Sequence, residues 1–426
     1  MHQTHFLLSA EARTLSMREV FAMNDARAFD LFRAVRWGRD ANPVCPACGV
    51  ADAHWFLASR QQWRCRACGH TFSVTSGTLF AHHKLPLQIY LGAIAIYANA
   101  VKGMSALQMA RDLDVQYKTA FVLMHKLRES LMVHRDETPL SGQAQLDGCY
   151  TNGSVKPANR AEDRVDRRLV EHRNPDRRCI LVMRETFPKD ALAERIGGKR
   201  TLTFVVPSEN QADVTALATR FIAPGTTLSA DESDAYDLLH AHYRMRRVNH
   251  SRAYRGADGT TINQAESYNS RFRRMQIGQH HQFGLANLAN YANEAAYRED
   301  TRRWSNGEIF RDILTKCAQT PPHRDWCGYW QGNTRRSRAP GGLGPPHARS
   351  QARRPSASVT ARAMPLAANR RSTAWAVFCM AVSISGRPSN PLRDAKVCAN
   401  APSDTGPALS RKTSRTRRWQ SPWPKR

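Results

Sequence analysis

The chain has 426 residues, and its lysines and arginines exceed its aspartates and glutamates by 27. This length accommodates two or three domains with cores of their own, and the basic balance favours a polyanionic partner. The longest apolar stretch, at 87–101, is too short to span a bilayer and predicts a buried helix. The N-terminus lacks the pattern of a secretory leader. We therefore expect a cytoplasmic protein rather than a membrane protein.

The N-terminal eighty residues divide into a helical segment and a cysteine-rich segment. Residues 1–40 are predicted to be helical, with Gly38 as C-cap. Within 41–80, two CxxCG motifs are separated by sixteen residues and contain Cys45, Cys48, Cys65 and Cys68. Four thiolates at this spacing are typical of a tetrahedral structural zinc, and a redox dithiol pair is the alternative. Whether this zinc ribbon contacts DNA or protein stays open.

Residues 84–135 are predicted to form two or three helices. Ala106–Leu113 and Tyr117–Leu131 would be joined by a short turn, with Ser105 as N-cap, which is a helix-turn-helix pattern. The second helix carries basic residues that we assign to DNA contact, namely Lys118, Lys126 and Arg128. The alternative is a plain helical hairpin with a solvated polar face.

The periodicity changes to that of strands at 143, and we expect one α/β domain over 143–318. The predicted order is strand, strand, strand, helix, strand, short helix, strand, helix. This is the order of a ribonuclease H-like fold.

Three carboxylates lie on predicted strands and helices of this domain. Asp147 and Asp231 each belong to a predicted strand, and Glu266 lies on a predicted helix, with 34 residues between it and Asp231. If they converge, they offer a hard oxygen site for Mg²⁺, which can promote phosphoryl displacement. Asp234 competes with Asp231 for the second position. Arg273 follows Glu266 by seven residues, on the same side of the helix.

The ordered set of motifs resembles bacterial insertion-sequence transposases that join an N-terminal zinc ribbon to a DDE catalytic domain (ISXO-type). The resemblance rests on CPACG, CRACGHTFSVTSGT, DGCY, SADESDAY, VNHS and the helix TINQAESYNSRFRR. It implies an enzyme that binds double-stranded DNA at terminal inverted repeats, as a homo-oligomer, and joins the ends to target DNA. Such a protein would associate with the nucleoid when bound to DNA.

The resemblance also implies roles for single residues. Asp147, Asp231 and Glu266 would be catalytic and bind two Mg²⁺ or Mn²⁺ ions, while Arg273 and Arg274 would hold the DNA backbone. Asn263 is implied as an accessory residue. His250 is a second candidate, with a core histidine satisfied by the backbone as the alternative.

The last ninety residues differ in composition from the rest. Residues 334–426 hold 19 lysines and arginines against 2 acidic residues and show no amphipathic period, which predicts a disordered basic tail. An out-of-frame extension of the gene is the alternative. Two rival functions stay open for the whole chain: a non-catalytic zinc-ribbon and helix-turn-helix regulator, and a ribonuclease H-like nuclease or resolvase.

Overall fold

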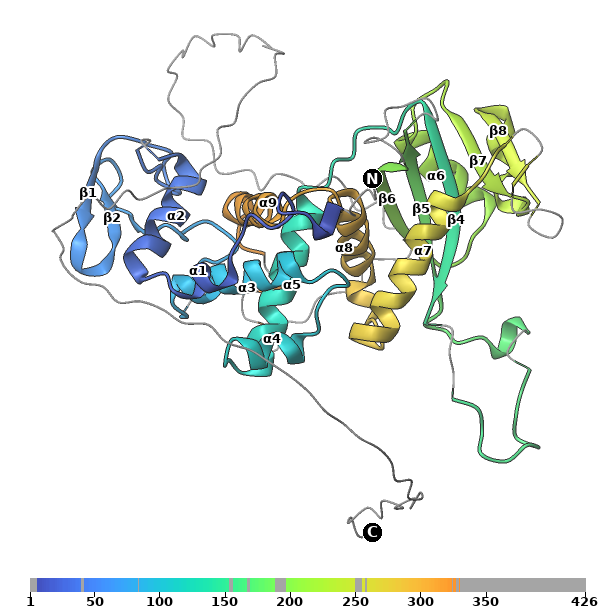
Figure 1. Cartoon of the computed structure of the whole chain (residues 1–426), viewed down its shortest axis with the longest axis horizontal. Helices are drawn as coiled ribbons and strands as arrows, with labels where there is room; N and C mark the ends of the chain where they lie inside the picture. The colour runs from blue at the N-terminus through green and yellow to red at the C-terminus, as the bar shows by residue number, and fades with distance from the viewer. Residues whose placement is uncertain are drawn as a thin grey trace, which may run out of the picture. The chain divides into compact units, whose positions relative to one another are not determined.

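The computed structural model describes residues 6–39, 42–82, 84–152, 156–166, 169–187, 197–249, 255–256, 259–323, 325–326 and 329. All of them belong to one compact unit, Met1–Ala352. They contain a three-stranded sheet of order β1-β2-β3 and a five-stranded sheet of order β6-β5-β4-β7-β8 (Figure 1). The predicted disordered tail, 334–426, lies outside the described residues.

Two helices precede the first sheet, α1 (Met17–Phe21) and α2 (Asp25–Trp37). Ser16 and Asn24 cap them, because each side chain accepts a hydrogen bond from the backbone N–H three residues further on. The second helix ends at Gly38, whose φ of 96° is open to glycine at little cost. The chain thus forms two helices where the sequence pattern predicted a helical segment.

The three-stranded sheet packs on α2 through aromatic residues, with Trp63 at the centre. Strands β1 (His54–Leu57), β2 (Gln62–Cys65) and β3 (Thr71–Phe72) are antiparallel neighbours. The Trp63 ring lies 5.5 Å from Phe29 and 5.3 Å from Trp37, both on α2, and 5.8 Å from Phe72 on β3. Large aromatic contacts of this kind supply much of the core in a small domain.

A helical core follows, built from α3 (Leu87–Asn99), α4 (Ala106–Asp112) and α5 (Tyr117–Val133). The ninth helix, α9 (Asn306–Gln319), adds its apolar residues to the same core although it lies far away in sequence. Nine of the thirteen residues of α3 are buried, as expected for the apolar stretch at 87–101. Across the part of the chain that the structure describes, no helix combines the length and apolar composition that crossing a membrane requires.

The five-stranded sheet is mixed, and its elements follow the order predicted for a ribonuclease H-like domain. Its strands are β4 (Gln143–Thr151), β5 (Arg178–Thr186), β6 (Gly198–Val206), β7 (Thr227–Asp231) and β8 (Arg244–Val248). The first three pair antiparallel, whereas β4, β7 and β8 are parallel. The predicted fold class of zinc ribbon, helical region and α/β domain is therefore confirmed.

Helices cover both faces of this sheet (Figure 1). On one face, α6 (Gln211–Phe221) and the 3-10 helix η5 (Asp234–Ala241) share a core with alternate residues of β4, such as Leu146. On the other face, α7 (Asn263–Met275) and α8 (Leu288–Asp300) share a core with Cys149. Since side chains alternate along a strand, Asp147 points to the same face as Cys149, toward α7.

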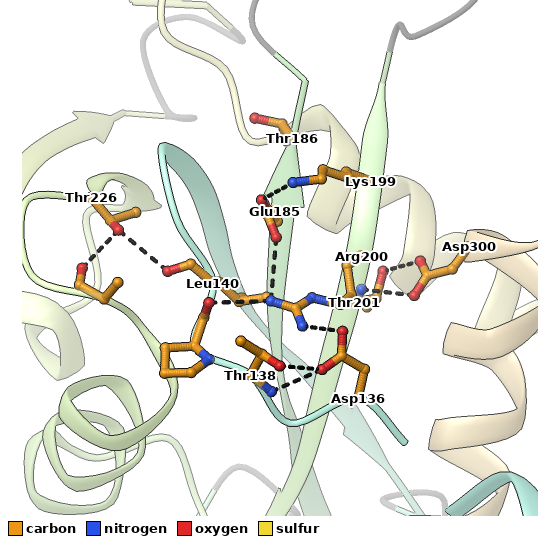
Figure 2. Close-up of polar contacts among 12 residues, drawn as sticks. Asp136, Thr138, Leu140, Glu185, Thr186, Lys199, Arg200, Thr201, Thr226 and Asp300 are labelled. Carbon is orange, nitrogen blue, oxygen red and sulfur yellow. Dashed lines mark hydrogen bonds and ion pairs between the residues drawn. The ribbon is translucent and has the colours of Figure 1, made fainter. Parts of the chain in front are cut away.

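The segment between the helical core and the sheet is fastened by charged groups (Figure 2). Arg200 on β6 donates to Asp136 at 2.5 Å and lies 3.4 Å from Glu185 on β5. Thr201 donates to Asp300, at the end of α8, through both its backbone N–H and its hydroxyl, each at 2.8 Å. These contacts tie the incoming chain and α8 to the same edge strand.

The prediction that Arg128 contacts DNA is wrong. Its side chain on α5 is only 1% exposed, and Nε donates to Glu294 of α8 at 2.6 Å. Arg298 donates to the same carboxylate at 2.8 Å and to the carbonyl of Ala100, after α3, at 2.5 Å. Burial alone would raise the pKa of Glu294, but the guanidinium groups of Arg128 and Arg298 lower it to about 2. This ion pair joins the helical core to α8.

We predict that Glu294→Gln destabilises the protein by about 3–5 kcal/mol, because it leaves the charge of Arg128 buried without its counter-charge. The free energy of unfolding of the full chain in urea, followed by tryptophan fluorescence, measures the effect. The matched control is Glu162→Gln, which breaks an exposed pair with Arg160, 3.5 Å apart, and should have almost no effect. Equal losses in the two variants would contradict the prediction.

Candidate functional site

The four predicted zinc ligands come together in the ribbon. Among the residues that the structure describes, Cys45, Cys48, Cys65 and Cys68 are the group of potential metal ligands whose ligand atoms lie within 4.8 Å of one another. Sγ–Sγ distances are 3.7 Å for Cys45 and Cys68 and 3.6 Å for Cys48 and Cys65. Four sulfurs bound to one zinc at about 2.3 Å would be separated by about 3.8 Å in a tetrahedron, so the cluster fits a structural zinc.

The two CxxCG turns have the same backbone geometry. Gly49 and Gly69 donate their N–H groups to the carbonyls of Cys45 and Cys65, at 2.9 and 3.0 Å. Both glycines have positive φ, 79° and 70°, which explains why glycine follows each pair of cysteines. Each turn thus presents two thiolates from one side.

The parallel pairing of β4 with β7 places Asp147 and Asp231 on neighbouring strands at corresponding positions. Gln143 of β4 lies opposite Thr227 of β7, and Gln145 opposite Ser229. If the same register continues for two residues on each strand, Asp231 lies beside Asp147. Asp231 is the last residue of β7, whereas Asp234 is exposed at the start of η5.

The helix that carries Glu266, α7, is anchored to the sheet at its first turn. The N-cap residue, Ile262, has no side chain that can accept a hydrogen bond. Gln145 of β4 supplies the acceptor instead, since its Oε1 accepts from the backbone N–H groups of Gln264 at 2.8 Å and Ala265 at 3.2 Å. Arg184 of β5, fully buried, donates to the carbonyl of Gln264 at 2.9 Å. The sheet therefore fixes both the position and the register of α7.

The pKa of Asp147 is shifted by burial and by the negative charges around it. Burial raises its pKa, the negative charge of Asp231 raises it further, and those of Glu209 and Glu266 add to the effect, giving about 7. The N–H of Gly148, which donates to Oδ1 at 2.8 Å, acts in the opposite direction. Like charges that act on a half-buried carboxylate make a place that favours a cation. The carboxylates are spaced more widely than the cysteine ligands.

A fourth carboxylate, Glu209, was not predicted. It lies in the loop between β6 and α6, accepts a hydrogen bond from the hydroxyl of Tyr236, and donates its backbone N–H to the hydroxyl of Tyr150 at 3.1 Å. Its carboxylate covers Gly148 so closely that a Cβ at that position would collide with it. A side chain at position 148 would therefore have to displace the carboxylate of Glu209 from its place beside Asp147. The sequence signal was weak, because one glutamate in a polar loop has no periodicity.

The remaining predicted residues lie at the rim of this site or apart from it. Asn263, Arg273 and Arg274 are exposed on α7. Burial raises the pKa of Cys149 while the guanidinium of Arg273 opposes that rise, so Arg273 lies beside β4, near Asp147. Away from the carboxylates, Lys118 is exposed and Lys126 half-buried on α5. His250 lies outside the described residues.

Comparisons with known proteins agree with this division of the chain. Residues 23–71 match the family model of the transposase zinc-ribbon domain, and residues 139–300 match that of the ISXO2-like transposase domain. An uncharacterized protein in transposable element ISH50 of Halobacterium salinarum is 24% identical over 299 residues, 68% of this chain and 96% of that protein. The zinc-ribbon match includes α2, which packs on Trp63, and the second match ends with α8.

We predict that the full-length protein holds one zinc and that Cys45→Ser or Cys68→Ser removes it, because each variant deprives the metal of one of four thiolates. Elemental analysis of the purified chain measures the zinc content. The full chain is needed because α9 completes the helical core.

The matched control for this prediction is Cys317→Ser. Cys317 is also a free cysteine but lies buried in α9, so its variant should keep the zinc. Full zinc content in Cys45→Ser would contradict the assignment, and so would a wild-type chain without zinc.

Proposed function

Since the chain is an insertion-sequence transposase with a transposase zinc ribbon and an ISXO2-like transposase domain, we propose that it cleaves the 3′ strand at its element's ends and joins the freed 3′-OH to target DNA. The observation that supports the proposal is that the negative charges of Asp231 and Glu266 both act on the half-buried carboxylate of Asp147. The substrates are double-stranded DNA carrying the terminal inverted repeats and the target DNA. We expect a homo-oligomer on this DNA.

We assign Asp147, Asp231 and Glu266 as the residues that hold two divalent ions, Mg²⁺ or Mn²⁺. Their donor atoms are carboxylate oxygens, which suit these hard ions. The raised pKa of Asp147 supports the fit, because a cation would relieve the repulsion from the neighbouring negative charges. When bound, such ions would stabilise the attacking and the leaving oxygen of the phosphoryl transfer.

The protein's own groups would hold and orient the DNA. Arg273 and Arg274 are exposed on the last turns of α7, on the helix that carries Glu266, and we assign them to the phosphates beside the scissile bond. Asn263 lies one turn before Glu266 on the same helix and is an accessory contact. Lys118 is exposed near the N-terminal end of α5, where the second helix of a helix-turn-helix reads bases; we assign Lys126, further along α5, to the backbone.

The outer face of the ribbon sheet supports a further DNA contact. Trp55 is 52% exposed and lies opposite Arg64 in the pairing of β1 with β2. The guanidinium of Arg66 stacks over the Trp55 ring, 4.9 Å from its centroid. A platform of one aromatic ring and two guanidinium groups can contact both bases and phosphates. For this reason we favour DNA over protein as the partner of the ribbon.

The catalytic assignment predicts that Asp147→Asn, Asp231→Asn and Glu266→Gln each lower strand cleavage by more than about 100-fold, beyond the 10–100-fold typical of residues that only support metal ligands. An amide keeps the shape of the side chain but loses the charge that holds the ions. Cleavage of a labelled duplex carrying the terminal repeat, with Mg²⁺ or Mn²⁺, measures the effect, and binding of the same duplex should change little.

Asp234→Asn is the matched control, because Asp234 is an exposed carboxylate just beyond β7. It should cleave almost as the wild type does. Normal cleavage by all three variants would overturn the DDE assignment, and an inactive Asp234→Asn beside an active Asp231→Asn would shift the second position. Cleavage without joining of the 3′ end to target DNA would favour a nuclease or resolvase.

The ribbon contact predicts that Trp55→Ala and Arg66→Ala weaken binding to the terminal repeat. Loss of the Arg66 phosphate contact should also reduce the slope of log K against log salt by about 0.9. Fluorescence anisotropy with a labelled duplex at several salt concentrations measures both. Arg311→Ala removes an exposed arginine from α9 and serves as control. Unchanged affinity and slope in the Arg66 variant would remove the ribbon from the DNA interface.

A further inference from the structure

Asn269 makes the side-chain contact that holds the first carboxylate of the site. It lies on α7 and is 5% exposed. Its Nδ2 donates to Oδ2 of Asp147 at 2.6 Å, while the N–H of Gly148 donates to Oδ1 at 2.8 Å. Each oxygen of Asp147 therefore has one donor from the protein, and the plane of the carboxylate is fixed.

The chemistry of the contact fixes which way the amide points. In the ionised form that binds a cation, the carboxylate of Asp147 has only acceptors, so the amide turns its NH₂ group toward it, as in the structure. Its Oδ1 is then buried, and has no hydrogen-bond partner among the described residues. A buried acceptor without a partner costs free energy.

The side chains around Asn269 are apolar, so packing alone does not explain an amide at this position. Its neighbours on α7, Tyr268 and Phe272, belong to an apolar core together with Cys149. An apolar side chain of similar volume would bury no unsatisfied oxygen there. The amide is thus a poor choice for packing alone, and the donated hydrogen bond to Asp147 is the interaction that distinguishes it from leucine.

Asn269 also couples two carboxylates through one helix. It follows Glu266 by three residues, so both side chains lie on the same face of α7, one turn apart. The first turn of this helix is fixed by the side chain of Gln145, which lies two residues before Asp147 on β4. The same rigid element therefore delivers Glu266 to the site and holds Asp147 in place.

We propose that Asn269 is a positioning residue that orients Asp147 for divalent-ion binding. The inference rests on the proposed function, in which Asp147 is an ion ligand. Hydrogen-bond partners of metal ligands typically account for about 10–100-fold in metal affinity. We expect Asn269 to contribute through the affinity for the ion and not through DNA binding.

The test compares Mn²⁺ binding and DNA cleavage in Asn269→Leu and Asn269→Ala. Leucine keeps the volume without the donor, and alanine removes the donor without any risk of overpacking. Isothermal titration calorimetry of Mn²⁺ with the zinc-loaded full chain should give a Kd raised by about 10–100-fold in both variants. The Mg²⁺ concentration for half-maximal cleavage should rise in parallel, with end-DNA affinity unchanged.

Two further variants separate the possible failures. Ser270→Ala changes the exposed neighbour of Asn269 on α7 and should leave the Mn²⁺ Kd as in the wild type. Asp147→Asn should abolish both Mn²⁺ binding and cleavage. If Asp147→Asn binds Mn²⁺ and cleaves normally, the proposed function itself fails. If Asp147→Asn is inactive but both Asn269 variants bind Mn²⁺ with wild-type Kd, the role of Asn269 is overturned.

Discussion

The parallel pairing of β4 with β7 is the constraint on which the rest of the site depends. A strand's side chains alternate between the two faces of a sheet, so a slip of one residue would turn Asp231 away from Asp147. The pairing of Gln143 with Thr227 excludes that slip, because it buries Leu146 and Leu228 on the opposite face. The apolar core under the sheet thus sets the register of two carboxylates that would repel each other.

The position of the third carboxylate, Glu266, depends on how the first turn of α7 is anchored. Glu266 lies on a helix whose N-cap position holds Ile262, which cannot cap it. Gln145 takes over this task from the neighbouring strand, and buried Arg184 binds the same turn through the carbonyl of Gln264. Polar groups that are costly to bury are therefore used to fix the helix that carries Glu266.

The sequence predicted those features that local pattern determines. The zinc ligands follow from two CxxCG motifs, and Asp147 and Asp231 follow from strand patterns that contain an acidic residue. It could not predict Arg128, whose position on α5 looked like a DNA-reading surface, because the partner that buries it is 166 residues away. Glu209 escaped for a similar reason, since its place over Gly148 is created only when the loop after β6 folds back onto β4. Contacts of this kind depend on tertiary packing, which single-sequence periodicity does not contain.

The buried pair of Arg128 and Glu294 has a consequence for how DNA recognition and chemistry are connected. Helix α8 is packed between α5 and the sheet, because Glu294 binds Arg128 of α5 while Asp300 binds Thr201 of β6. Separating α5 from α8 would expose or orphan charged groups that are almost fully buried, which is costly. The proposed reading helix and the carboxylate-bearing sheet are thus joined by α8 in addition to the chain segment that connects them. A DNA end held by α5 would consequently be presented to the carboxylates in a fixed orientation, and free hinge motion between recognition and cleavage is disfavoured at this junction.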